Sequence, residues 1–204
     1  MKLFCQQYGD GDVLIMLHGL FGMSDNLASI GKKLAERRRV IIPDQRNHGR
    51  SEHRDTMSYA LMAQDILQLM DEAGIGQADV LGHSMGGKAA MQFASHYPQR
   101  VRRVIVADIA PVAYPHHYDL VFAGLFAVRD AGCISRSDAD KVLASFVSDA
   151  AVRQFLLKSL IKGDDDVMQW RFDVDALHRN YDEICAAPVL SYPFAGPALV
   201  LKGE

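Results

Sequence analysis

The stretch Gly82–Gly87, which reads G-H-S-M-G-G, is the feature that most constrains the fold of this chain. A short apolar run ending at Leu81 precedes it, and a helical pattern of apolar residues follows it over Lys88–His96. This order predicts that Ser84 lies on a sharp strand-to-helix turn, a nucleophile elbow, with its hydroxyl exposed. Glycines suit such a turn, because side chains there would collide with the neighbouring strand and helix. The alternative is a glycine-rich turn without a chemical role.

Apolar strands and amphipathic helices alternate through the first half of the sequence. Continuous apolar runs predict strands buried on both faces, and apolar residues three and four apart predict helices. The expected strands are Val13–Leu17, Val40–Ile42, Val80–Leu81 and Val104–Ala107, and the expected helices are Asp25–Glu36 and Ser58–Ala73. The pattern predicts an α/β fold, a mostly parallel sheet with helices on both faces and an active site at the carboxyl ends of its strands.

The pattern changes after about residue 110, where helical segments follow one another without strands between them. They are expected near Asp119–Arg129, Ser137–Ser148, Val152–Ile161 and Asp175–Glu183. We therefore expect a core over 1–109, a helical lid over 110–187 and a return to the core over 188–204, with one more buried strand at Ala198–Leu201. The alternative is that these are ordinary helices of the outer layers.

Composition limits the classes of partner. The chain has 204 residues, enough for one domain, and a formal net charge of −3 without a basic stripe, which argues against a nucleic-acid partner. No apolar run approaches the roughly 18 residues of a membrane span, so no membrane partner is expected. Cys5, Cys133 and Cys185 are widely spaced, which argues against a disulfide framework or a zinc site and favours the reducing cytoplasm.

A serine nucleophile needs donors for the oxyanion that forms when it attacks a carbonyl. We expect one donor to be the backbone N–H of Met85, directly after Ser84. The second is expected from the loop after the first buried strand, from the N–H of Leu20 or Phe21. His18 in the same loop is expected to brace it through its ring nitrogens rather than to act as a base.

Asp108 ends a buried strand, and a carboxylate at such a place must be paired or solvated. The functional interpretation is that Asp108 orients a histidine as the third member of a triad, and the alternative is that it caps a following turn. The loop Asp44–Ser51 is expected to bond within itself and to the loop that carries His18. Phe21, Phe122, Phe126 and Trp170 are candidates for an apolar acyl pocket, with plain core as the equal alternative.

Four motifs together resemble the α/β-hydrolase superfamily and, within it, the bacterial YbfF-type esterases. They are, in chain order, HGLFG, DxRNHGxS, GHSMGGK and the D-I-A-P-V stretch from Asp108; QFLLKSL at Gln154–Leu160 and W-R-F at Trp170–Phe172 also resemble that branch's lid. The resemblance covers nearly the whole chain. It implies hydrolysis of short-chain acyl esters, with acyl-CoA thioesters as a further substrate class, through an acyl-serine intermediate and without metal or organic cofactor.

The same resemblance implies positions for the rest of the triad. In this branch the acid follows the strand after the elbow, which matches Asp108, whereas elsewhere in the superfamily it would fall at or just beyond Glu204. The implied catalytic histidine also lies beyond Glu204, with the last strand and helix of the fold. None of the eight histidines, His117 of the lid included, is expected to serve Ser84 as a base, so residues 1–204 are expected to be a weak esterase or inactive. A non-catalytic small-molecule-binding protein and a non-hydrolytic lyase stay open as alternatives.

Overall fold

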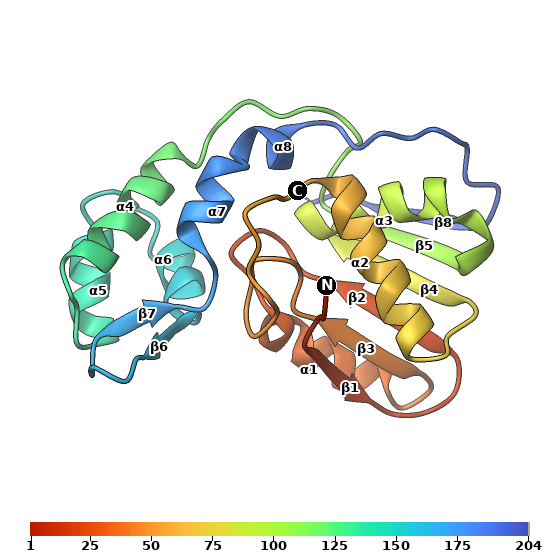
Figure 1. Ribbon diagram of the computed structural model, residues 1–204, viewed down its shortest axis with the longest axis horizontal. Helices are drawn as coiled ribbons and strands as arrows, with labels where there is room; N and C mark the ends of the chain where they lie inside the picture. The colour runs from red at the N-terminus through yellow and green to blue at the C-terminus, as the bar shows by residue number, and fades with distance from the viewer. Residues whose placement is uncertain (204) are drawn as a thin grey trace.

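A six-stranded sheet forms the centre of the computed structural model, which describes residues 1–203. The strands lie in the order β1-β3-β2-β4-β5-β8 (Figure 1). Their bounds are β1 (Cys5–Tyr8), β2 (Val13–Leu17), β3 (Arg39–Pro43), β4 (Ala78–His83), β5 (Val101–Ala107) and β8 (Ala198–Leu201). β1 runs antiparallel to β3, and the other neighbouring pairs of this sheet are parallel. The predicted mostly parallel sheet is therefore confirmed.

Helices cover both faces of the sheet. α1 (Ser24–Leu34) packs on one face, and α2 (Tyr59–Glu72) and α3 (Met85–His96) pack on the other (Figure 1). Because side chains alternate along a strand, Leu14 and Met16 of β2 join the cluster on the α1 side, while Ile15 and Leu17 join the large cluster on the other side. This burial on both faces explains the unbroken apolar run of β2.

Residues 110–187, called the insertion below, contain most of the remaining helices and lie at the left and top of Figure 1. The helices are α4 (Asp119–Asp130), α5 (Arg136–Leu143), α6 (Ala150–Leu157), α7 (Val174–Arg179) and α8 (Tyr181–Cys185). Val128, Leu143, Leu157 and Leu160 form a separate small apolar cluster within it. None of the helices over residues 1–203 is long and apolar enough to cross a membrane.

The prediction that the insertion lacks strands is wrong, because β6 (Leu160–Lys162) and β7 (Met168–Trp170) form an antiparallel hairpin. The helix expected over Val152–Ile161 ends at Leu157. There the Ser159 hydroxyl donates to the carbonyl of Phe21 (3.1 Å), and the Ser159 carbonyl accepts from the amide of Arg171 (2.9 Å). These contacts turn the chain, so that Leu160 enters the small cluster from a strand.

The helix expected over Asp175–Glu183 is divided into two helices, α7 and α8, which meet at Asn180. The Asn180 side-chain amide donates to the carbonyl of Ala176 (2.7 Å) and to that of Asp55 in the core (2.8 Å). The break therefore ties the insertion to the core at the point where the chain turns back toward the sheet.

β8 pairs with β5 along four residues, from Val104 opposite Ala198 to Ala107 opposite Leu201. The expected strand is thus present, but the expectation that it is buried is wrong for the described residues. Its side chains are exposed, with Leu199 and Val200 at 51% and 66%.

Candidate active site

Ser84 lies on the turn between β4 and α3, as the sequence predicts. Its φ of +52° and ψ of −122° are strained for a residue with a side chain. The glycines on either side are required by space. A Cβ atom at Gly82 would lie 2.1 Å from the carbonyl oxygen of Gly86, and one at Gly86 would lie 2.5 Å from that of Leu17. The turn therefore holds Ser84 at the positive N-terminal end of α3, which favours negative charge nearby.

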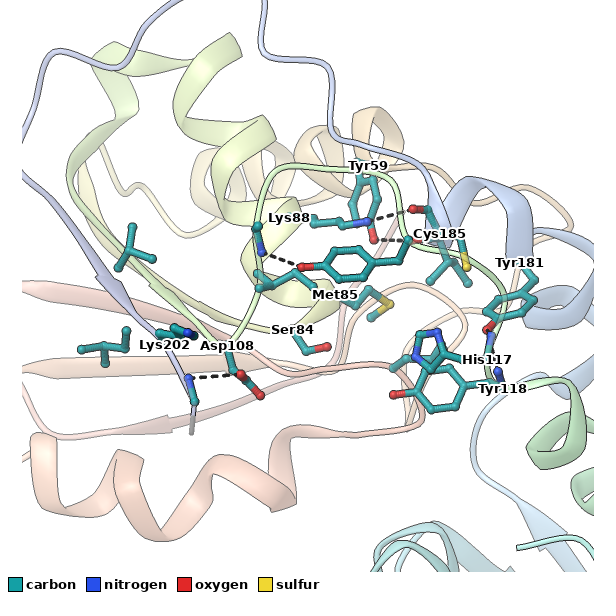
Figure 2. Close-up of a pocket in the computed structure, with 18 residues that line it drawn as sticks. Tyr59, Ser84, Met85, Lys88, Asp108, His117, Tyr118, Tyr181, Cys185 and Lys202 are labelled. Atoms are coloured by element: carbon teal, nitrogen blue, oxygen red, sulfur yellow. Dashed lines mark hydrogen bonds between the residues drawn. The ribbon is translucent and has the colours of Figure 1, made fainter.

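Asp108 lies beside Ser84 at the same edge of the sheet, directly after β5 (Figure 2). The Ser84 amide donates to the carbonyl of Ala107 (2.9 Å), which joins the two turns. Asp108 has a positive φ of 56°, and its own amide donates to the carbonyl of Leu201 (2.8 Å). Its carboxylate is exposed and accepts from the amide of Gly203 (3.3 Å). The carboxylate is thus free to meet a further partner, and its role in a triad stays a prediction.

Two of the three amides predicted as candidate oxyanion donors, those of Leu20 and Met85, are available, and that of Phe21 is not. Met85 is the first residue of α3 and has no intrahelical partner for its amide, and the Leu20 amide likewise donates to no residue within 1–203. Both residues line the same cavity as Ser84. Phe21 differs, because its N–H donates to His48 Nε2 (3.2 Å). Of the two alternatives in that loop, the structure leaves the amide of Leu20 available.

Two buried histidines brace the loops behind Ser84. His18 Nδ1 bonds the carbonyl of Gly19 (2.8 Å), and its Nε2 accepts from the amide of Gln45 (2.9 Å). His48 Nδ1 bonds the carbonyl of Arg46 (2.7 Å), while its Nε2 accepts the Phe21 amide. Burial lowers the pKa of His18 and lowers the pKa of His48 to about 3, so both rings are neutral at pH 7. This confirms the prediction that His18 braces its loop, and it leaves neither ring free as a base.

The polar loop that follows β3 is bonded as the sequence predicts. The Asp44 carboxylate accepts from the amides of Ser24 (2.6 Å) and Arg50 (2.9 Å). The Arg46 guanidinium forms two parallel hydrogen bonds of 2.9 Å with the Asp65 carboxylate of α2, and both groups are buried. Such paired and hydrogen-bonded charges make the loop a rigid support for the site.

A cavity of about 700 Å³ opens beside Ser84, a volume typical of small-molecule sites. The core and the insertion build it together. The core supplies Leu20, Tyr59, Ser84, Met85, Lys88 and Asp108, and the insertion supplies Tyr114, His117, Tyr118, Tyr181, Ile184 and Cys185 (Figure 2). Its walls are therefore mainly tyrosine and aliphatic, with a few polar groups.

The four aromatic residues predicted for the acyl pocket are not among the described residues that line this cavity. Phe21 and Phe122 pack edge to face at 5.3 Å, and both are almost fully buried. Trp170 donates from its indole nitrogen to the carbonyl of Leu125 (3.0 Å), and Phe126 packs on His178 at 5.3 Å. Their rings hold the insertion together instead, which corresponds to the alternative of plain core.

The tyrosines of the cavity were missed because no periodic pattern marks them. Tyr114 and Tyr118 lie in the irregular stretch between β5 and α4, and Tyr181 begins α8. The closeness of the Tyr114–Tyr118 stretch to Asp108 in the sequence is the signal that could have found them.

His117, which is not expected from the sequence to serve Ser84 as a base, lines the cavity. Its Nδ1 bonds the carbonyl of Pro115 (2.9 Å), and the ring is exposed. No histidine within residues 1–203 hydrogen-bonds Ser84. The alternative acid position at or beyond Glu204 lies outside the described residues.

The fold and the strained serine turn define an α/β hydrolase. The chain belongs to this family, since residues 12–128 match the α/β hydrolase fold. It is 38% identical over 206 residues to the sn-1-specific diacylglycerol lipase of Mus musculus, covering 95% of this chain and 67% of the lipase. It is 36% identical over 180 residues to Esterase YbfF of Escherichia coli (strain K12), covering 88% of this chain and 69% of the esterase.

A solved structure described as a marine microorganism esterase superposes with a TM-score of 0.95 at 36% identity. The superposition covers 100% of this chain and 81% of that one. The chain spans about two thirds of the length of the mouse and Escherichia coli relatives. The resemblance to YbfF-type esterases is thereby confirmed at the level of the family.

Proposed function

We propose that the whole protein is a serine carboxylic-ester hydrolase that acts on short-chain acyl esters, with acyl-CoA thioesters as a second substrate class. One observation carries the proposal: Ser84 is held at positive φ at the start of α3, and Leu20 and Met85, whose amides donate to no residue within 1–203, line the same cavity. The names of the relatives, two esterases and a lipase, support it.

In the proposed mechanism Ser84 Oγ attacks the carbonyl carbon of the ester, and a histidine base takes the hydroxyl proton. The Leu20 and Met85 amides and the positive end of α3 stabilise the oxyanion. The Asp108 carboxylate orients the histidine and stabilises its charged form. The histidine then protonates the departing alcohol or thiol, and water attacks the acyl-serine ester to release the acid and restore Ser84.

We also propose that the insertion acts as the lid of this site, because its residues form one side of the cavity. The cavity walls favour an uncharged acyl group, since most lining groups are apolar or tyrosine. Free thiols at Cys5, Cys133 and Cys185 support a place in the cytoplasm.

The test is to react the whole protein with a fluorophosphonate, which labels an activated serine, and to assay p-nitrophenyl acetate and butyrate in parallel. We expect one label, on Ser84, with release of nitrophenol and the free acid. A protein that takes no label yet binds a small ester unchanged would be a binding protein on this fold. Products other than an acid and an alcohol would favour a lyase.

Residues 1–204 on their own offer a second test. We expect slow turnover of p-nitrophenyl butyrate, because no histidine within residues 1–203 hydrogen-bonds Ser84. The oxyanion donors alone should still accelerate hydrolysis about 10³–10⁴-fold over the reaction in water. Added imidazole, which can replace a missing base, should raise this rate, and it should have no effect on a Ser84→Ala chain. A high rate that is independent of imidazole would mean that a histidine such as His117 acts as the base.

A further inference from the structure

We propose that Lys88 is a positioning residue that holds the last turn of α8 over the cavity and thereby determines how well larger esters bind. The inference rests on the proposed function for its substrate class. Lys88 does not take part in the proposed chemistry, although it lies on α3 one turn after Ser84.

The contacts of the Lys88 ammonium are made to the end of the insertion. Nζ donates to the carbonyl of Cys185 at 3.0 Å (Figure 2) and to that of Ala186 at 2.7 Å, where α8 ends. The last carbonyls of a helix have no intrahelical partner and carry partial negative charge, so a cation is favourable there. Lys88 thus caps α8 from a different part of the chain.

A second side chain from the core holds the same segment. The Tyr59 hydroxyl of α2 donates to the carbonyl of Ile184 (2.6 Å). Three successive carbonyls, at residues 184 to 186, are therefore bound by two side chains from the helices that pack behind Ser84. The rings of Tyr114 and Tyr59 lie 4.9 and 5.5 Å from Lys88 Nζ, close enough for cation–π attraction.

The cost of burying this charge argues that its donors have a role. Lys88 is 2% exposed, and within residues 1–203 no carboxylate lies in ion-pair distance of it. Burial lowers the pKa of the ammonium, as expected of a charge removed from water without a counter-ion. An apolar side chain of the same length would fill the space without this penalty. What only the lysine supplies is a pair of directed hydrogen bonds to α8.

The position of the held segment links it to substrate binding. Ile184 and Cys185 line the cavity with Ser84, and the following residues, 187–197, form neither helix nor strand before β8. Without Lys88, the roof formed by residues 184–186 would be tied to the core by fewer contacts. A small ester needs only the serine and the oxyanion donors, whereas a long one also contacts the roof.

The experiment compares Lys88→Met with the wild-type whole protein, because methionine has a similar length and no donor. Lys33→Met, at an exposed position of α1, is the matched control. We expect Lys88→Met to raise KM for p-nitrophenyl octanoate about tenfold, the scale of losing hydrogen bonds to a charged group. KM for the acetate ester and the rate of Ser84 labelling by a small fluorophosphonate should stay within about threefold. Tyr59→Phe should act in the same direction with a smaller effect.

Hydrogen–deuterium exchange gives a readout that does not depend on turnover. In Lys88→Met the amides of residues 184–190 should exchange faster, with the core strands unchanged. The proposal is overturned if residues 184–190 of Lys88→Met exchange at the wild-type rate, or if the ratio of KM for the octanoate ester to KM for the acetate ester is unchanged. So does faster exchange throughout the chain, which would show a merely structural role. If the wild type hydrolyses neither ester, the proposed function fails, and the exchange of residues 184–190 still decides whether Lys88 holds α8.

Discussion

The cavity beside Ser84 has a floor built from the core and a roof built from the insertion. The floor consists of strand ends whose backbone is fixed by buried side chains, such as His18, His48 and the paired Arg46 and Asp65. The roof packs into the main apolar cluster through Tyr181, Ile184 and Cys185, and its backbone is held by a few long-range hydrogen bonds. The Tyr181 hydroxyl accepts from the amides of residues 117 and 118, and Lys88 and Tyr59 bind the end of α8.

This difference separates two tasks. Proton transfer and oxyanion binding need donors fixed to a fraction of an ångström, which the bonded and strained floor can provide. Selection among substrates needs only a cavity surface that is complementary in shape to the substrate, and the roof can change this surface without disturbing the floor. We therefore expect changes in the floor to alter kcat or stability, and changes in the roof to alter KM.

The largest effect is expected from Ser84→Ala in the whole protein. Loss of the nucleophile should lower kcat by about 10⁶-fold, the scale found for the serine of a triad. The variant should stay folded, because alanine keeps the Cβ atom and meets the same backbone strain. The checks are p-nitrophenyl butyrate turnover and a urea unfolding curve. Retention of more than a few per cent of kcat would exclude Ser84 as the nucleophile.

Asp108→Asn is expected to lower kcat by about 10⁴-fold, because the amide no longer stabilises a charged histidine. Asparagine tolerates the positive φ of this position and can still accept the bond from Gly203, so stability should change little. The measurement is kcat for the butyrate ester with the unfolding midpoint as control. A loss below tenfold would place the triad acid elsewhere.

Phe122→Ala and Tyr118→Ala form a matched pair across the insertion. Phe122 is 1% exposed and packs on Phe21, so its truncation should cost about 3–5 kcal/mol of unfolding free energy and leave KM of the folded fraction unchanged. Tyr118 lines the cavity, and its truncation should raise KM with a smaller loss of stability. Denaturant unfolding and ester kinetics measure both. A KM effect from Phe122 alone would restore the predicted aromatic pocket.

The smallest expected effect is a pH dependence of the unfolding free energy, which originates in the two buried histidines of the floor. His18 and His48 have pKa values below the ordinary 6.5 in the native state, so below about pH 6.5 the unfolded chain binds protons that the folded chain does not. Stability should therefore be complete above pH 6.5 and fall as the pH drops below it, for His48 by about 1.4 kcal/mol per pH unit toward pH 3, with His18 adding a loss in the same direction. Urea unfolding between pH 7 and 5.5 measures the slope. His48→Asn should reduce that slope, and an unchanged slope would contradict the assignment.

Much of the floor could be predicted from the sequence, because the patterns that mark its strands and turns lie within a few residues of one another. Gly82 is required by the backbone of Gly86, four residues away, apolar runs mark the strands, and Asp108 follows directly from the end of one. Gly86 is required by a distant contact, the carbonyl of Leu17 in β2. Even there, the engagement of the Phe21 amide depends on His48, which no local pattern reveals.

The roof could not be predicted to the same degree, because its form depends on distant contacts. The residues around Leu157 and Leu160 are spaced as in a helix, and the switch to a strand depends on the bond from Ser159 to Phe21. The side of the insertion that faces Ser84 is likewise decided by tertiary packing. Phenylalanine and tryptophan went to the buried side, and tyrosine, with its polar hydroxyl, went to the cavity.

The pairing of β5 with β8 has a consequence for how the protein is made. Val104 and its partner Ala198 are separated by the whole insertion. At a synthesis rate of roughly 5–20 residues per second, β5 waits for β8 on the ribosome for about 5–20 s. During that interval β1 to β5 can already form a sheet whose last strand offers unpaired backbone groups to any neighbouring nascent chain. The interval is therefore the time in biosynthesis at which this protein is most exposed to mispairing and has most use for a chaperone.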